Sequence, residues 1–147
     1  MNETYEVLLY TMASQFRKAL VSAIRSGDIR NLYWKSFPKG CCDGACNMLQ
    51  RYFIENNVET LIVSGRFENS KYGHSWLETP KGIVIDITGD QFVNTRHHFE
   101  QDVYVGARDN GFYDTFVNLS KHSYREYDAP FLDPNRQEYE IVKRYLS

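Results

Sequence analysis

The stretch that organises the chain closes a loop and opens a helix, and it contains all three cysteines. It reads Phe37-Pro38-Lys39-Gly40-Cys41-Cys42-Asp43-Gly44-Ala45-Cys46. A cysteine in the first turn of a helix lies at the positive end of the helix dipole, beside backbone N–H groups that lack helical partners. Both features favour the thiolate over the thiol, so we expect a sulfur nucleophile in this stretch.

The composition is that of a globular protein with one core. The chain has 147 residues, of which 42% are hydrophobic and 24% charged, so we expect a single domain over residues 1–147. A formal net charge of −2 without a basic stripe argues against nucleic acid as a partner. No apolar run approaches the ~20 residues that span a bilayer, and the first residues lack a secretory signal. We therefore expect a cytoplasmic protein without membrane contact; export by another route stays open, and the sequence does not indicate an oligomeric state.

Three cysteines within six residues do not form a disulfide framework, because one thiol stays unpaired in any scheme within the chain. A reducing compartment suits them better. The alternative is a small zinc-stabilised interaction domain, since Cys42 and Cys46 lie one helical turn apart. The sequence offers no second C-x-x-C pair and no H-x-x-x-H to complete such a site. We therefore expect no metal and no organic cofactor.

The hydrophobic patterns predict an α+β fold. Apolar residues at three- and four-residue spacing predict helices at residues 4–26 and 42–56, and Asp133-Pro134 is typical of the start of a last helix. Runs rich in β-branched residues predict strands at residues 60–64, 73–79, 83–88 and around 102–106. Residues 107–133 lack clean periodicity and are expected to be irregular. The predicted architecture is a nucleophile-bearing helix packed on an antiparallel sheet of about four strands.

Asp86 is the one charged residue in an otherwise apolar strand, where a carboxylate is costly unless it is paired. If residues 80–82 form a three-residue hairpin loop, Trp76 lies opposite Asp86. His74 and Asp86 then share one face as diagonal neighbours, with Cα atoms ~7–8 Å apart. A two-residue loop would place them on opposite faces. The sequence therefore predicts a His74–Asp86 pair only with an odd-length loop.

Other assignments remain open on residue type alone. His97, His98 and His122 are equally available as imidazoles by composition. Asp90 is a rival carboxylate in the turn after the strand, and an arginine is an alternative partner for Asp86. Nucleophilic thiol catalysis requires a thiolate, an imidazole and a group that orients the imidazole, which Cys42, His74 and Asp86 would supply.

Four short motifs resemble those of the transglutaminase-like superfamily, in the same order over residues 40–88. Gly40-Cys41-Cys42-(x2)-Ala45 is similar to its G-x-C-x-x-A opening, and Leu61-Ile62-Val63-Ser64-Gly65 to a strand ending in V-x-G. His74-Ser75-Trp76-Leu77-Glu78 resembles its H-a-W-v-E strand, and Ile85-Asp86-Ile87-Thr88 its D-x-T strand. The Cys, His, Asp order also resembles the wider papain-like group of thiol peptidases and amidases.

The resemblance implies a papain/transglutaminase-like fold with Cys42 as nucleophile, His74 as general base and Asp86 as the orienting acid. It also implies an oxyanion site made by the backbone N–H of the nucleophile and an upstream side chain, for which Tyr33 and Trp34 are the candidates. Trp34 and Trp76 are expected to shield the thiol.

The chain departs from the family pattern in three places. Gly44 replaces a bulky residue, Cys41 is a spare thiol, and the helix at residues 4–26 has no counterpart.

The expected function is therefore cysteine-dependent acyl transfer on a peptide or amide substrate, through a thioester on Cys42. Peptidase, amidase, deamidase and transglutaminase activities are not separable at this level. A catalytically inactive binding module on the same fold is the alternative, beside the zinc-stabilised domain.

Overall fold

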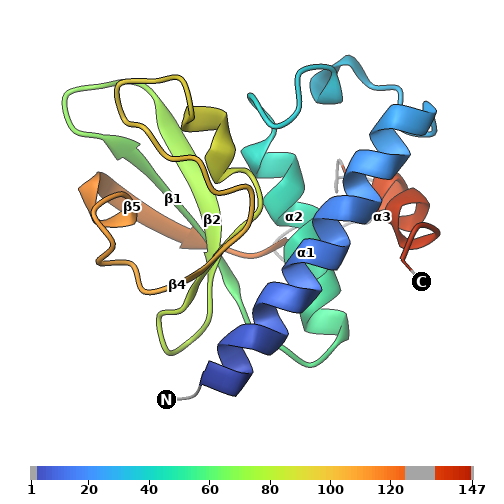
Figure 1. The fold of residues 1–147 in the computed structure, drawn as a ribbon, viewed down its shortest axis with the longest axis horizontal. Helices are drawn as coiled ribbons and strands as arrows, with labels where there is room; N and C mark the ends of the chain where they lie inside the picture. The colour runs from blue at the N-terminus through green and yellow to red at the C-terminus, as the bar shows by residue number, and fades with distance from the viewer. Residues whose placement is uncertain (1–2, 125–134, 147) are drawn as a thin grey trace.

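The computed structural model describes residues 3–124 and 135–146, and within them the fold is α+β (Figure 1). The α-helices are α1 (Glu3–Ser26), α2 (Cys42–Glu55) and α3 (Arg136–Lys143). The strands are β1 (Leu61–Phe67), β2 (Gly73–Glu78), β3 (Val84–Asp86), β4 (Tyr104–Gly106) and β5 (Phe116–His122). They form one antiparallel sheet in the order β4-β3-β2-β1-β5, and short 3-10 helices occur at η1 (Leu32–Trp34), η2 (Gly89–Phe92) and η3 (Tyr113–Thr115).

The helical predictions agree with the structure where it describes them. α1 and α2 end within a residue or two of their expected bounds, and Gly27 follows α1 with a φ of 85°, which a glycine adopts without strain. The predicted start of the last helix at Asp133-Pro134 lies outside the described residues. Among those residues, no helix combines the length and apolarity that crossing a bilayer requires.

The sheet corrects one sequence prediction. It has five strands rather than about four, because β5 occupies a part of residues 107–133 that was expected to be irregular. β5 is an edge strand of which only Phe116 is buried, so no apolar alternation marks it. Its pairing with β1 also contains a register shift between Ser64 and Arg66, and Asn118 has a φ of 56°. β5 forms by pairing with the edge of β1, which lies more than 40 residues earlier in the chain.

The hairpin of β2 and β3 has the predicted register. Leu77 lies opposite Ile85 and Glu78 opposite Val84. The backbone N–H of Thr79 donates to the carbonyl of Ile83 over 3.0 Å, which closes a three-residue loop. The odd loop length places His74 and Asp86 on one face of the sheet.

Two cores lie on opposite faces of this sheet. The helix-side core packs α1 and α2 against the sheet and includes Leu9, Phe16, Leu20, Leu49, Phe53, Ile62, Leu77 and Ile85. The loop-side core is mostly aromatic and is formed with the segment between β3 and β5. It consists of Val63, Phe67, Trp76, Val84, Phe92, Phe112, Tyr113 and Phe116. Adjacent residues of β2 divide between them because successive side chains of a strand point to opposite faces. Figure 1 shows the helices gathered on one side of the sheet.

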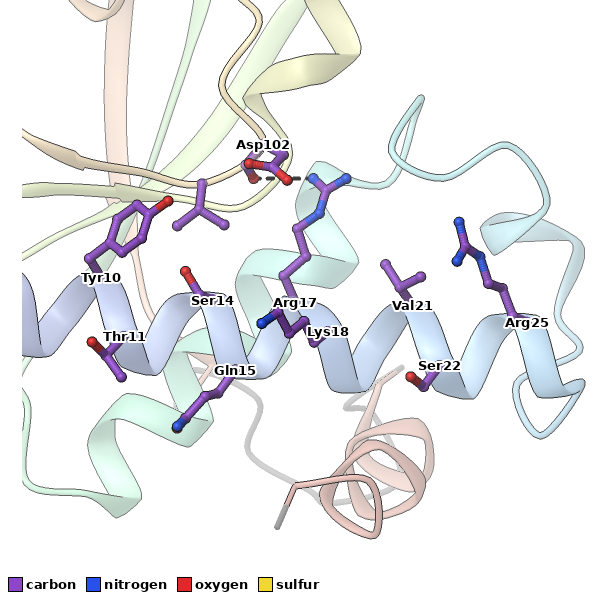
Figure 2. A pocket seen from close by; sticks show the side chains of 11 residues that line it. Tyr10, Thr11, Ser14, Gln15, Arg17, Lys18, Val21, Ser22, Arg25 and Asp102 are labelled. Carbon is purple, nitrogen blue, oxygen red and sulfur yellow. Dashed lines mark hydrogen bonds between the residues drawn. The ribbon is translucent and has the colours of Figure 1, made fainter.

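An arginine on α1 fixes the segment that follows β3. The Arg17 guanidinium donates to both carboxylate oxygens of Asp90, at 2.8 and 3.0 Å, and to the backbone carbonyls of Ile87 and Asp102 at 2.7 and 3.1 Å. Figure 2 shows this side chain reaching from α1 toward Asp102. A bidentate arginine–carboxylate pair adds geometric definition to its attraction. The N-terminal helix therefore holds the turn that carries Asp90, four residues after Asp86.

Candidate active site

Cys42 is the first residue of α2, and it is the one of the three cysteines that is partly exposed. The Cys42 side chain lies near His74, at the start of β2, and its proximity raises the pKa of that imidazole. The thiol therefore lies at a helix N-terminus, where backbone N–H groups are free to face an anion, and beside an imidazole.

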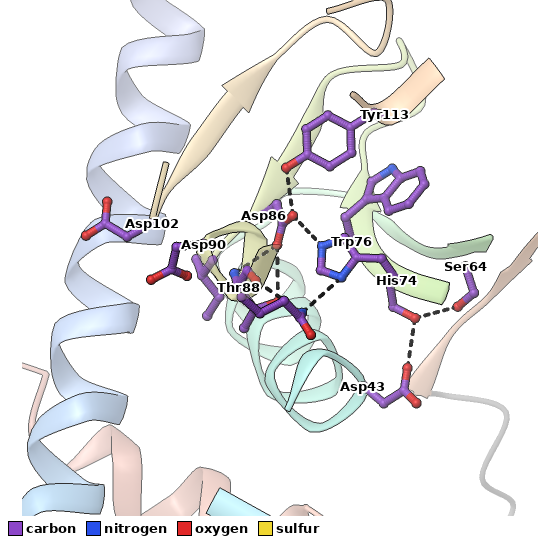
Figure 3. A network of polar contacts seen from close by, with 12 residues as sticks. Asp43, Ser64, His74, Trp76, Asp86, Thr88, Asp90, Asp102 and Tyr113 are labelled. Carbon is purple, nitrogen blue, oxygen red and sulfur yellow. Dashed lines mark hydrogen bonds and ion pairs between the residues drawn. The ribbon is translucent and has the colours of Figure 1, made fainter. Parts of the chain in front are cut away.

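The His74 imidazole is joined to the Asp86 carboxylate. His74 Nε2 lies 2.6 Å from Asp86 Oδ2, and the two residues are 2% and 1% exposed (Figure 3). Because Nε2 is bonded to Asp86, the thiol can meet the ring only on its Nδ1 side, where the Gln91 amide also lies. The structure thus brings together Cys42, His74 and Asp86, the three side chains that the sequence singled out.

Asp86 receives more hydrogen bonds than the sequence indicated. The Tyr113 hydroxyl donates to Oδ2 over 2.7 Å, and the Thr88 backbone N–H donates to Oδ1 over 2.9 Å. The Thr88 hydroxyl adds a longer contact to Oδ1 at 3.3 Å. Burial raises the pKa of Tyr113, so its hydroxyl keeps its proton and remains a donor. Donors to both oxygens stabilise the ionised carboxylate in an apolar setting.

These contacts settle the charges of the buried pair. Burial by itself raises the pKa of Asp86, but the charge and hydrogen bond of His74, with the bonds from Tyr113 and Thr88, lower it below its ordinary value. Burial likewise lowers the pKa of His74, but the Asp86 carboxylate and the Cys42 contact outweigh burial and raise it to about 10. At neutral pH the pair is therefore an imidazolium and a carboxylate.

Gln91 is a further neighbour of the imidazole that sequence reasoning missed. Its side-chain amide nitrogen lies 3.2 Å from His74 Nδ1 and donates to the Thr88 carbonyl over 3.1 Å. Gln91 and Tyr113 belong to the segment between β3 and β5, where no periodicity assigns a direction to any side chain. No sequence signal available without the fold identifies either residue.

The rival residues have other partners. Asp90 is held by Arg17, and Arg108 forms its ion pair with Glu78 rather than with Asp86, at 2.6 Å. His97 stacks on the Phe67 ring at a centroid distance of 3.7 Å, and His98 is exposed and contacts the Val93 carbonyl. His122, at the end of β5, lies opposite Ile62.

Both tryptophans near the site direct their indole N–H groups at carboxylates. Trp34 donates to Glu138 over 2.8 Å, and Trp76 donates to Glu78 over 2.9 Å. The Tyr33 hydroxyl accepts from the Gly44 backbone N–H over 2.9 Å, and its own proton remains to be donated. Of the two candidate oxyanion donors, Tyr33 therefore keeps a free donor atom and Trp34 does not.

Packing explains why Gly44 stands where the family pattern has a bulky residue. A Cβ at this position would lie 2.8 Å from the Tyr33 ring and 3.0 Å from the Trp34 ring. The rings of Tyr33 and Trp34 therefore occupy the space that a side chain at residue 44 would need, so this position requires a glycine.

A chain of polar contacts holds the start of α2 against the sheet. Ser75 donates to Asp43 over 2.8 Å, and the hydroxyls of Ser75 and Ser64 lie 2.7 Å apart (Figure 3). Asp43 follows Cys42 and Ser75 follows His74, so these contacts set the position of the thiol relative to the imidazole.

The other two thiols are buried. Burial raises the pKa of Cys41 to about 11, and its S–H group donates to the carbonyls of Tyr33 and Lys39 at 3.2 and 3.3 Å. Burial also raises the pKa of Cys46 well above its ordinary value. Within residues 3–124 and 135–146, no three His, Cys, Asp or Glu side chains are grouped to hold a metal ion.

A cavity of about 770 Å³ opens beside Cys42, and Gly40, Gly73 and Gln91 also line it. The other large cavity, of about 850 Å³, runs along α1 away from the thiol and is lined by residues such as Lys18 and Arg25 (Figure 2). Comparison with protein-family models, with curated proteins and with solved structures finds no match for the chain. Any functional reading therefore rests on the residues of the site.

Proposed function

We propose that this protein is a cysteine-dependent acyl-transfer enzyme of the transglutaminase-like and papain-like type, acting on a peptide or amide. The observation that carries the proposal is the bond between His74 Nε2 and the buried Asp86 carboxylate, with Cys42 close enough to raise the pKa of the imidazole. The Asp86 carboxylate accepts from four donors: the ring of His74, the hydroxyl of Tyr113, and the backbone N–H and hydroxyl of Thr88. Burying a charged pair is costly if it serves the fold alone, whereas it suits a site that must keep an imidazole protonated. The order of the motifs over residues 40–88 supports the same type of enzyme.

The chemistry follows from the positions of the atoms. The Cys42 thiolate attacks the amide carbonyl carbon, and the C=O electron pair moves to the oxygen. The oxyanion forms near the first turn of α2, where backbone N–H groups point outward. When the C–N bond breaks, the nitrogen takes a proton from His74 Nδ1 and leaves as an amine. Water or a second amine then attacks the thioester, gives a proton to the neutral His74, and the C–S bond breaks to release the Cys42 thiolate and restore the starting state.

Asp86 and its donors have a positioning role in this scheme. The carboxylate holds Nε2, which leaves the Nδ1 side of the ring, beside Gln91, to act on the thiol and the substrate. Tyr113 and Thr88 keep the carboxylate ionised, so that it stabilises the imidazolium throughout. The loop-side core around them excludes water, which strengthens each of these interactions.

Iodoacetamide labelling with peptide mapping tests the proposal without knowledge of the substrate. At pH 6 we expect Cys42 to be alkylated selectively, because Cys41 and Cys46 are buried. Exposure alone would give this selectivity, so the decisive comparison is His74→Gln, which should slow the labelling by about tenfold or more because the imidazolium no longer stabilises the thiolate.

His98→Gln is the matched control, because this exposed histidine contacts Val93 and Glu100 and does not line the cavity that contains the thiol, so its variant should label like the parent protein. Circular dichroism confirms that both variants are folded. Equal rates in the parent and His74→Gln proteins would favour the inactive binding module. Fast labelling of Cys41 instead of Cys42 would overturn the assignment of the nucleophile.

A further inference from the structure

The cavity beside Cys42 is continuous with the proposed catalytic groups. Gly40 and Gly73 line it on either side of the thiol, two residues before Cys42 and one before His74. Neither glycine places a side chain between the cavity and the Sγ atom. Gln91, which contacts His74 Nδ1, lines the same cavity. A molecule in this space therefore reaches the sulfur directly.

The wall opposite these residues consists largely of aromatic rings. Phe67 and Phe92 pack edge to face at a centroid distance of 5.4 Å, and the half-buried His97 ring lies parallel to Phe67. Tyr72 extends the wall toward solvent with a side chain that is 67% exposed. His97 and Phe116 cover the two faces of Phe67, so a flat or bulky apolar group in the cavity would meet the half-buried His97 ring and the exposed Tyr72 ring.

The charged residues that line the cavity do not favour a ligand of either charge over an apolar one. Arg96 and Glu68 both line the cavity, both are exposed, and their charges are opposite. A second cavity of about 590 Å³ opens beside Asp43 and Gly44 of α2, and both polar and apolar side chains line it, Glu138 and Ile62 among them. The first cavity is the more apolar of the two, and Cys42 lines the first and not the second.

We infer that the cavity beside Cys42 is the substrate cleft, and that it selects amides carrying an aromatic or large apolar group next to the scissile carbonyl. The inference rests on the proposed function, because Cys42 must be the reacting atom. A volume of about 770 Å³ lies in the range of small-molecule sites, about 300–1,000 Å³, and accommodates such a group. The aromatic wall binds the apolar group of the substrate, and Cys42, which lines the same cavity, then attacks the carbonyl carbon.

The test compares two alkylating probes that differ only in the group to be recognised. Chloroacetamide and N-benzylchloroacetamide each lose chloride as the Cys42 sulfur bonds to the CH₂ carbon. Burial of the benzyl group should raise the second-order labelling rate of Cys42 about tenfold or more over the parent probe, with saturation at high concentration. Peptide mapping follows both reactions, and free glutathione corrects for the intrinsic reactivity of each probe.

Tyr72→Ala removes part of the aromatic wall from an exposed position, and its backbone hydrogen bonds with Phe67 and Ser70 do not depend on the ring. This variant should lose several-fold of the benzyl preference, measured as the ratio of the labelling rates with the two probes. The matched control is Tyr10→Ala, because Tyr10 is an exposed tyrosine that lines the distant cavity on α1. Its benzyl preference should equal that of the parent protein.

The outcomes separate the two claims. Fast Cys42 labelling by both probes with no benzyl preference overturns the substrate cleft and leaves the proposed function standing. A benzyl preference that survives in Tyr72→Ala and falls in Tyr10→Ala also overturns the cleft, because another surface then binds the ring. Slow labelling of Cys42 by either probe, equal to that of His74→Gln, overturns both.

Discussion

The two faces of the sheet are stabilised in different ways. On the helix-side core, α1 and α2 cover the sheet with aliphatic and aromatic residues that recur at helical spacing. On the loop-side core, an irregular segment covers the sheet with rings, and the charged His74 and Asp86 lie among them. Cys42 belongs to the helix layer, whereas its imidazole partner belongs to the loop layer.

The difference shows which face of the sheet sets the position of the thiol and which face sets the charges of His74 and Asp86. The helix-side core positions the thiol through the N-terminus of α2, and among the described residues it makes no ion pair with the proposed catalytic groups. The loop-side core must hold a carboxylate and an imidazolium without water, so each of its polar atoms has a partner. Loss of packing on the first face should reduce stability alone, whereas a change on the second should also alter charge.

The largest effect should come from removing the buried carboxylate. Asp86→Ala leaves the His74 N–H and the Tyr113 hydroxyl without their acceptor, and breaking a buried pair in this way costs about 3–5 kcal/mol. Leu77→Ala on the same hairpin, but on the helix-side core, should lose a comparable amount, about 2–5 kcal/mol. Urea titration measures both.

Iodoacetamide labelling of the same two proteins at pH 6 sharpens the comparison. Leu77→Ala should keep fast labelling of Cys42 under conditions where it is folded, whereas Asp86→Ala should lose it. If both variants label like the parent protein, the carboxylate does not act on the thiol through His74.

The second effect is a change in how stability depends on pH. The pKa of folded His74 is raised from 6.5 to about 10, so its contribution to stability is full below pH 6.5 and disappears as the pH rises toward 10. The pKa of Asp86 is lowered from 3.8, so its contribution is present above pH 3.8 and is lost as the pH falls further. The pair should therefore stabilise the fold most between these limits.

Asp86→Asn should reverse the trend on the alkaline side. With the charge removed, only the smaller effect of Cys42 opposes burial, so the pKa of His74 should fall and the free energy of unfolding should rise with pH through about 6.5. Urea titrations at pH 5, 7 and 9 measure this in both proteins. Parallel curves for the parent and the variant would mean that His74 is not an imidazolium in the fold.

The smallest of the three effects should come from Tyr113→Phe. This variant removes one hydrogen bond to a charged group, which is worth about 1.5–3 kcal/mol, and keeps the ring in the loop-side core. It should raise the pKa of Asp86 and lower that of His74, so labelling of Cys42 at pH 6 should slow several-fold.

Tyr104→Phe is the control, since this tyrosine packs against Tyr113 but donates to the Ala107 carbonyl instead. Its labelling should match that of the parent protein. Equal slowing in both variants would assign the effect to packing and not to the hydrogen bond.

The sequence predicts the structure correctly where hydrophobic residues recur at helical or strand spacing. The spacing of Phe16 and Leu20 predicts α1, and an odd loop between Thr79 and Ile83 predicts which face His74 and Asp86 share. The contact between Asp86 and Tyr113 has no such basis, because the two residues are 27 positions apart and the segment around Tyr113 has no periodicity. β5 is unpredicted for the same reason, since an exposed edge strand is defined by its partner and not by its own pattern.

The buried position of Cys41 has a consequence for oxidation. A sulfenic acid formed on an exposed cysteine is commonly reduced when a nearby resolving thiol condenses with it to a disulfide. Cys41 is adjacent in sequence, but its S–H group faces the carbonyls of Tyr33 and Lys39 and its raised pKa keeps it protonated. Recovery of oxidised Cys42 therefore depends on a small-molecule thiol that enters from solvent, and without one the sulfur proceeds to irreversible acids.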